Sequence, residues 1–186
     1  MSHPDPKEEL ISLMPNLRGF AMSLCRNRSL ADDMMQDTIV KAWAKIDTFE
    51  PGSNMKAWLF TILRNTYYTR HQKMKREVSD KDGAFTDTLS VKPDHDGRLQ
   101  MRDFKTAFET LPDEQREALM LVGAQGFSYE EAADTVGVAI GTIKSRVNRA
   151  RAALTELMSL DGESAMELTD QSTVAVINRD IILENQ

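Results

Sequence analysis

Apolar residues in the N-terminal half of the chain recur with the spacing of helices. From Lys7 to Arg26 they follow the i, i+3, i+4, i+7 pattern of one amphipathic helix, in which Pro15 predicts a kink. A second helix is expected to start at a Ser29 cap, with a buried stripe at Met35, Ile39, Trp43 and Ile46. A third begins near Met55 and buries Trp58, Leu59, Ile62 and Leu63. The pattern predicts a three-helix unit that ends near Arg76.

The periodicity stops between residues 77 and 99, where the chain is polar and acidic, so this segment is expected to be a flexible linker. Beyond it, Phe104, Phe108 and Leu111 mark a short helix, and Pro112 opens another. These helices are expected to pack beneath the segment that follows. The tail of residues 161–186 has apolar islands in an acidic background, which leaves disorder, folding back onto a basic face and docking on a partner all open.

Residues 128–151 have the pattern of a helix-turn-helix. Ser128 and Glu131 have capping-box spacing, and Gly137 permits a sharp turn into a second helix from about Ala139 to Leu154. The outer side of this second helix carries cations and short polar groups and no acid: Thr142, Lys144, Ser145, Arg146, Asn148, Arg149 and Arg151. Thr142, Lys144, Ser145 and Arg146 are placed to contact base edges in a major groove. The later Arg149 and Arg151 are placed to contact phosphates. The alternative is a three-helix core with a solvated basic face.

The end of the third helix, residues 64–76, is a second basic segment. Cations alternate there with Tyr67, Tyr68 and His71, and no acid interrupts them. Aromatic rings offer stacking platforms for unpaired bases while arginine and lysine hold the backbone. The alternative is a solubilising helix end with half-buried tyrosines.

Composition narrows the class of protein. With 186 residues, 41% hydrophobic and 28% charged, the chain fits two small globular domains. No apolar run is long enough to span a bilayer and the start of the chain is polar, so no membrane association and a cytoplasmic location are expected. Cys25 is the only cysteine, which excludes an internal disulfide and a cysteine-rich zinc site.

The net charge of −6 does not oppose binding to DNA. The segment from Ala152 to Gln186 holds seven acidic residues and one basic residue, which accounts for the whole net negative charge. Residues 1–151 therefore have no net charge, and their cations are clustered. His3, His71 and His95 lie in dissimilar contexts without evident partners, and no glycine-rich phosphate loop occurs. We therefore expect no enzyme activity, no cofactor and no metal.

Together these segments resemble the extracytoplasmic-function (ECF) group of bacterial sigma factors, the promoter-specificity subunits of RNA polymerase. Residues 31–43 resemble region 2.1 to 2.2, residues 57–65 and the basic stretch resemble regions 2.3 and 2.4, and residues 111–119 with the helix-turn-helix resemble region 4. The resemblance implies an all-α fold of two small helical domains. It divides the chain into region 2 (1–76), a linker (77–99), region 4 (100–160) and an acidic tail (161–186).

The resemblance also implies functional residues. The polymerase clamp helices would meet the polar face formed by Asp32, Asp33, Gln36, Asp37 and Lys41. The melted −10 strand would meet Asn54, Trp58, Arg64, Asn65, Tyr67, Tyr68, Arg70, His71 and Lys73, with the loop from Phe49 to Met55 cradling a flipped base. The helix-turn-helix would read the −35 duplex, although Ala139 stands where many members have a capping residue.

The partners implied are core RNA polymerase, promoter DNA and an anti-sigma factor, of the NepR type if the similarity to the general-stress subgroup holds. In a sigma factor active with polymerase the linker is expected to hold the two regions apart, whereas the sequence leaves open whether they pack together in the free chain. Three other functions are alternatives: a stand-alone helix-turn-helix regulator, a sigma-like decoy for an anti-sigma factor, and a nuclease or other hydrolase. The retained cations argue against the decoy, and the lack of an acid cluster suited to metal argues against the nuclease.

Overall fold

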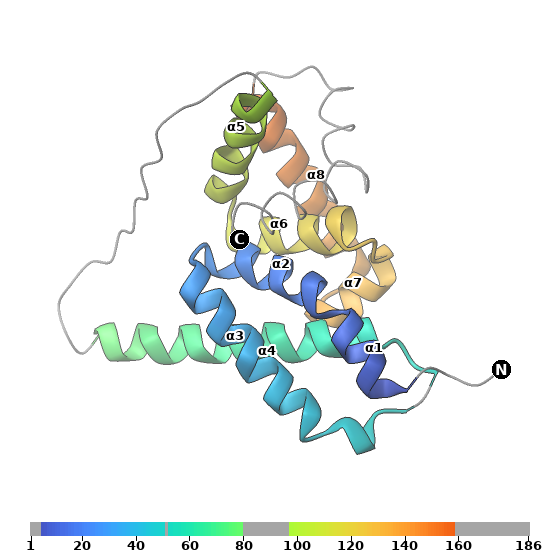
Figure 1. The fold of residues 1–186 in the computed structure, drawn as a ribbon. Coiled ribbons are helices and arrows are strands. Elements are labelled where there is room, and N and C mark those ends of the chain that lie inside the picture. Colours follow the sequence, from blue (N-terminus) through green and yellow to red (C-terminus); the bar gives the residue numbers. More distant parts are fainter. Residues whose placement is uncertain (1–4, 51, 80–96, 159–186) are drawn as a thin grey trace.

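The computed structural model describes residues 5–50, 52–79 and 97–158, and all the regular elements in these ranges are helical (Figure 1). The N-terminal unit consists of α1 (Pro6–Ser12), α2 (Met14–Cys25), α3 (Arg28–Trp43), the 3-10 turn η1 (Ile46–Thr48) and α4 (Met55–Ser79). The C-terminal unit consists of α5 (Gly97–Thr110), α6 (Asp113–Leu119), the π-helical turn η2 (Met120–Ala124), α7 (Tyr129–Val136) and α8 (Ile140–Leu157). The all-α prediction is confirmed.

The first predicted helix is two helices. The break falls at Leu13, whose N–H bonds back to carbonyls of α1, and Pro15 occupies the first turn of α2. Proline is tolerated there because the first N–H groups of a helix have no partner within it. The interruption expected at Pro15 is therefore present, but it lies two residues earlier, at Leu13, and divides the segment into two helices.

The predicted cap and buried stripe of the second helix were also wrong, except at Ile46, which is buried in η1. The cap of α3 is Asn27, whose side chain accepts from the Leu30 N–H at 3.0 Å, rather than Ser29. The fully buried positions are Ala31, Met34, Thr38 and Ala42, whereas Trp43 is 49% exposed. The small side chains allow α3 to approach α2 and α4 closely, and this close packing selects a stripe one residue from the predicted one.

The predicted linker begins and ends within helices. α4 extends to Ser79 and α5 starts at Gly97, so both ends of the segment 77–99 are helical. The linker residues 80–96 and the tail 161–186 lie outside the described residues. Among those described, no helix is both long and apolar enough to cross a membrane.

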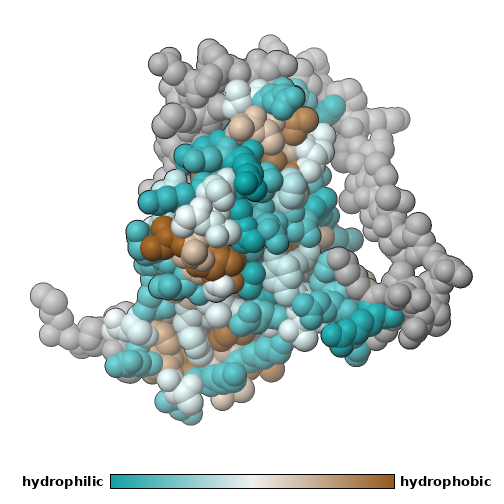
Figure 2. Space-filling model, turned by 180° about the vertical axis from the view of Figure 1, so that it is seen from behind, coloured by the Kyte–Doolittle hydropathy of each residue, from teal (hydrophilic) through white to brown (hydrophobic). Residues whose placement is uncertain are grey.

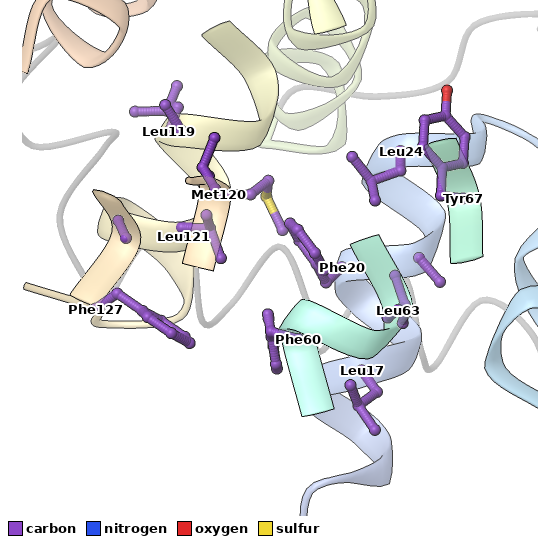
Figure 3. Packing of buried hydrophobic residues seen from close by; sticks show 14 of the residues in the cluster. Leu17, Phe20, Leu24, Phe60, Leu63, Tyr67, Leu119, Met120, Leu121 and Phe127 are labelled. Atoms are coloured by element: carbon purple, nitrogen blue, oxygen red, sulfur yellow. The ribbon is translucent and has the colours of Figure 1, made fainter. Parts of the chain in front are cut away.

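The two units pack on each other, with α2 lying between α4 and α6 (Figure 1). Their apolar side chains form one continuous core, in which α2 and α4 contribute Phe20 and Phe60 and the C-terminal unit contributes Met120, Leu121 and Phe127 (Figure 3). The rings of Phe60 and Phe127 lie 5.2 Å apart, and those of Phe20 and Phe60 4.8 Å apart. The sequence left open whether the two units pack together in the free chain, and in this conformation they do.

Outside this core the apolar surface is sparse. Figure 2 shows a rear face that is mostly hydrophilic with small, separated hydrophobic patches. The large apolar side chains that are exposed in the described part of the chain are spread over four helices: Ile11 on α1, Val40 and Trp43 on α3, Met74 on α4, and Ile140 and Leu157 on α8. Functional surfaces on this molecule must therefore be sought among its charged and aromatic side chains.

Candidate nucleic-acid interface

The turn between α7 and α8 has helix-turn-helix geometry. Ser128 Oγ accepts from the Glu131 N–H at 3.1 Å, and Glu131 Oε2 accepts from the Ser128 N–H at 2.8 Å. Gly137 then takes φ +76°, a conformation that costs glycine little. Ala139 caps α8 without a side-chain hydrogen bond. The capping box and the turn glycine predicted from the sequence are confirmed.

One face of α8 is buried against the C-terminal unit, and the opposite face is exposed. Ile143 and Val147 are fully buried, which fixes the helix against the C-terminal unit. Lys144, Asn148 and Arg149 are exposed, while Thr142 and Ser145 are half-buried at the start of the helix. Exposed cations and hydroxyls near a helix N-terminus are the groups that reach phosphates and base edges in a major groove.

The basic face of α8 is narrower than the sequence indicated. Arg146 is only 15% exposed at its side chain, and its Nη2 donates to Glu114 Oε2 at 2.6 Å. Arg151 is half-buried, and its Nε finds no hydrogen-bond partner among the described residues. Lys144 Nζ lies 5.7 Å from the ring centre of Tyr129. Of the predicted cations of α8, Lys144 and Arg149 are the exposed ones.

The basic segment of α4 is partly covered by the C-terminal unit. Arg64 Nε donates to Glu117 Oε1 at 2.9 Å, and Tyr68 Oη donates to Glu117 Oε2 at 3.3 Å. The Arg64 guanidinium also lies over the Tyr68 ring, 4.6 Å from its centre. Burial raises the pKa of Glu117 above its ordinary value of 4.5, and the Arg64 charge opposes that rise. Burial and the Glu117 carboxylate raise the pKa of Tyr68.

The remaining candidates on α4 lie in different environments. Tyr67 is 7% exposed and belongs to the core, and burial raises its pKa to about 12. The His71 ring stacks on Tyr67 with 5.6 Å between centres. Asn65 and Lys73 are exposed. In this conformation Tyr67 supports the helix and offers no free ring face to a base.

The loop before α4 is anchored at both ends. Phe49 is buried and its ring lies 5.2 Å from that of Trp58, so the half-buried Trp58 is braced against the loop. Asn54 caps α4 by accepting from the Ala57 N–H at 3.0 Å. Its Nδ2 donates across to Glu131 Oε1 at 2.8 Å.

The acidic face of α3 adjoins the basic segment of α4. Asp33 and Asp37 lie 3.6 Å and 4.0 Å from the Arg70 guanidinium, and Lys41 Nζ donates to Thr66 Oγ1 at 2.9 Å. Asp32 is paired instead with Arg18 at 3.0 Å, while Gln36 is exposed. Two residues of each predicted set line one shared groove between α3 and α4: Asp37 and Lys41 of the polymerase-binding set, and Arg70 and Lys73 of the −10-binding set.

Comparison with known proteins identifies the family. Residues 11–77 match the model of sigma-70 region 2, and residues 101–154 match that of sigma-70 region 4. The chain is 51% identical over 156 residues to the ECF RNA polymerase sigma factor EcfG of Rhodopseudomonas palustris, covering 84% of this chain and 86% of that protein. It belongs to the ECF family of RNA polymerase sigma factors.

Two further relatives agree with this family. The ECF sigma factor SigM of Bacillus subtilis is 30% identical, with 77% of this chain and 89% of that protein covered. The solved structure of the sigma factor RpoE in complex with the anti-sigma factor NepR, from Bartonella quintana, is 54% identical and superposes with a TM-score of 0.75. That match covers 83% of this chain and 97% of the other.

Three acids and an arginine between the two units of this sigma factor have roles that the sequence did not indicate. Glu114, Glu117 and Glu131 each bond a candidate DNA-binding side chain, and of these only Glu131 was expected to matter, as part of the capping box. Arg116 is fully buried and donates to the Ser23 carbonyl at 2.5 Å, the Leu111 carbonyl at 2.8 Å and Asp113 at 2.8 Å. Their signal was a charged run in a helix expected to be buried, which is unusual unless the charges are paired. Within the described residues no cluster of metal-ligating side chains occurs.

Proposed function

We propose that this sigma factor directs core RNA polymerase to promoters through two separate DNA-binding surfaces. In this proposal residues 1–76 bind the polymerase and the −10 element, residues 77–99 link the units, and residues 100–160 bind the −35 element. Residues 161–186 form an acidic tail without an assigned role. The protein acts in the cytoplasm beside the polymerase, which supplies the catalysis.

The observation that carries the proposal is the geometry of α7 and α8. A capped helix, a left-handed glycine and a second helix with exposed Lys144, Asn148 and Arg149 form a unit that fits a major groove. The −35 set is Thr142, Lys144, Ser145, Arg146, Asn148, Arg149 and Arg151. Arg146 joins this set once Glu114 releases it.

The second surface lies on α3 and α4 and includes the groove that these two helices share. Clamp helices of the polymerase would contact Asp32, Asp33, Gln36, Asp37 and Lys41. The unpaired −10 strand would contact Asn54, Trp58, Arg64, Asn65, Tyr68, Arg70, His71 and Lys73, while Tyr67 supports the helix from the core. Because Arg70 lies beside Asp33 and Asp37, polymerase binding at the acids would free a cation next to the DNA.

Reconstituted transcription tests this function. Purified core polymerase with this chain should start RNA synthesis on a pool of randomised promoters, and polymerase alone should not. Sequencing the transcribed templates should reveal two motifs at a fixed separation. A gel-shift of the free chain on the selected duplex separates the alternatives, because a stand-alone regulator would bind tightly without polymerase and a sigma factor would not.

We also infer that an anti-sigma factor of the NepR type controls this chain, within a stress response. The support is the 54% identical Bartonella quintana sigma factor, whose structure contains NepR. Adding a purified NepR-type protein to the reconstituted reaction should suppress transcription in proportion to its concentration. Undiminished transcription with the anti-sigma factor in excess would refute this assignment and leave the promoter function standing.

A further inference from the structure

Arg146 differs from the other cations of the −35 set because it is paired with an acid. Its Nη2 donates to Glu114 Oε2 at 2.6 Å, and its side chain is 15% exposed. Lys144, Arg149 and Arg151 lie on the same helix and form no ion pair with any described residue. The −35 set therefore contains one cation whose charge is neutralised at close range.

The pair joins two helices of the same unit. Glu114 lies in the first turn of α6, and α6 packs against α8, which carries Arg146. The Glu114 side chain is 65% exposed, so its carboxylate stands at the surface beside α8. Because both residues belong to the C-terminal unit, the pair does not depend on how the two units are arranged. A duplex that approaches α8 meets the Glu114 carboxylate together with Arg146.

A DNA phosphate would offer Arg146 little that Glu114 does not already supply. Carboxylates and phosphates are both anionic acceptors of charge-assisted bonds from a guanidinium. Exchange of one for the other yields little net attraction, and the carboxylate left behind repels the phosphates around it. Phosphates are present along every duplex, so Glu114 would remove one contact from binding that is independent of sequence.

A base edge would offer a different exchange. Glu114 accepts a single hydrogen bond from Arg146, whereas the O6 and N7 atoms of guanine accept two from one guanidinium in the major groove. Contacts of Lys144 and Arg149 would hold α8 at the depth of the bases only where the sequence fits. The gain from leaving Glu114 is then largest at a matching site.

We propose that Glu114 is a specificity-determining residue, which withholds Arg146 from the phosphates of arbitrary DNA and yields it to a guanine of the −35 element. This inference rests on the function proposed above. The natural chain gives up some affinity for DNA in general and gains a larger ratio between binding at the −35 element and binding elsewhere.

A matched pair of variants isolates the effect of the Glu114 charge. Glu114→Gln keeps the size of the side chain and removes its charge. Glu130→Gln is the control, because both glutamates are exposed and each is the second residue of its helix, α6 or α7, so both changes affect the helix dipole alike. Adding Arg146→Ala to Glu114→Gln tests whether the effect acts through Arg146. Circular dichroism checks that each variant remains helical.

The first measurement is the affinity of the full chain for a labelled duplex of unrelated sequence, by fluorescence anisotropy over a series of salt concentrations. Glu114→Gln should bind about fivefold more tightly at low salt, and the slope of log K against log salt should steepen by about 0.9, because one more phosphate is neutralised. Glu130→Gln should stay within about twofold of the natural chain and keep its slope. Arg146→Ala in the Glu114→Gln chain should remove both gains.

The second measurement is transcription by the reconstituted holoenzyme from a selected promoter and from the same promoter with its −35 element scrambled. The ratio of the two yields reports specificity. Glu114→Gln should lower this ratio about fivefold, because contacts to phosphate strengthen on both templates alike. Glu130→Gln should leave the ratio unchanged.

Equal gains for Glu114→Gln and Glu130→Gln would overturn the proposal, because bulk charge would then explain them. A gain that survives Arg146→Ala would overturn it as well. Equal losses of transcription from both templates, with an unchanged salt slope, would show that Glu114 only braces α8. Transcription by the natural chain from the selected promoter is a separate test, so a failure of the promoter function is distinguishable from a failure of the role given to Glu114.

Discussion

Replacing Gly137 with alanine isolates the backbone cost of the turn that positions α8. Gly137 has φ +76°, and a Cβ built there meets no atom within 4 Å. Steric crowding with neighbours therefore contributes nothing, and the penalty comes from the left-handed backbone itself. For a residue with a side chain this penalty is about 1–2 kcal/mol.

Gly141 supplies a matched control in the same motif. It lies in the first turn of α8, and a Cβ there also meets no atom within 4 Å. Alanine is favoured over glycine in a helix by about 0.5–1 kcal/mol, so Gly141→Ala should stabilise the protein. The same added methyl group should thus shift stability in opposite directions, and the two variants should differ by about 2 kcal/mol.

Urea unfolding followed by circular dichroism measures both variants. Because the two units share one core, we expect a single transition, with the midpoint moved and the slope unchanged. In thermal unfolding each kcal/mol corresponds to a shift of about 2–8 °C. Equal midpoints for the two variants would show that Gly137 does not hold the left-handed turn, and the geometry of α7 and α8 given above would then be incorrect.

Three further predictions concern the surfaces and the core. Lys144→Ala should weaken holoenzyme binding to the −35 duplex by about 1–3 kcal/mol, and Lys105→Ala, an exposed lysine of α5, should not; equal losses in a quantitative gel-shift would contradict the role of α8. Reversing Asp32 and Asp33 to lysine should abolish co-purification with core polymerase while circular dichroism stays helical, and normal co-purification would refute the interface. Burial raises the pKa of the Cys25 thiol from 9.0 to about 12, so the native thiol should resist alkylation at neutral pH and react at once in denaturant. The folded state then holds a proton that the unfolded state loses, so stability should fall as the pH rises from 9.0 towards 12, and substituting Cys25 with serine should flatten that fall.

Local signals made the helix-turn-helix predictable from the sequence. The capping box of Ser128 and Glu131 and the left-handed Gly137 act within a few residues of chain, and the structure has both. Pro112 is a local signal of the same kind, and α6 begins directly after it, at Asp113. Where a residue type is required by nearby backbone, the sequence indicates it directly.

The register of α3 was not predictable in this way. Large apolar side chains at Met35, Ile39 and Trp43 indicate one stripe, while Met34 and Ala42 belong to another that the packing selects. Which stripe is buried depends on how closely α2 and α4 pack against α3, and this is a property of the tertiary structure. Helical periodicity identifies a face only when one stripe is clearly more apolar than its neighbours.

The contacts between the two units depend on residues that are far apart in the sequence. Glu117 and Arg64 are far apart in the sequence and meet only when the two units pack, so no local pattern joins them. The sequence indicated which cationic and aromatic residues could bind DNA. It could not indicate that Tyr67 lies in the core or that Arg146 is paired with Glu114.

The shared core also governs the order in which the chain can fold during synthesis. Phe60 is covered by Phe127, which leaves the ribosome much later. At a translation rate of about 5–20 residues per second, several seconds pass between the synthesis of Phe60 and that of Phe127, and the aromatic surface of α2 and α4 is exposed to water during this time. We therefore expect a nascent chain of this protein to need chaperones until α7 has been translated, and truncation before Phe127 should yield an aggregating fragment.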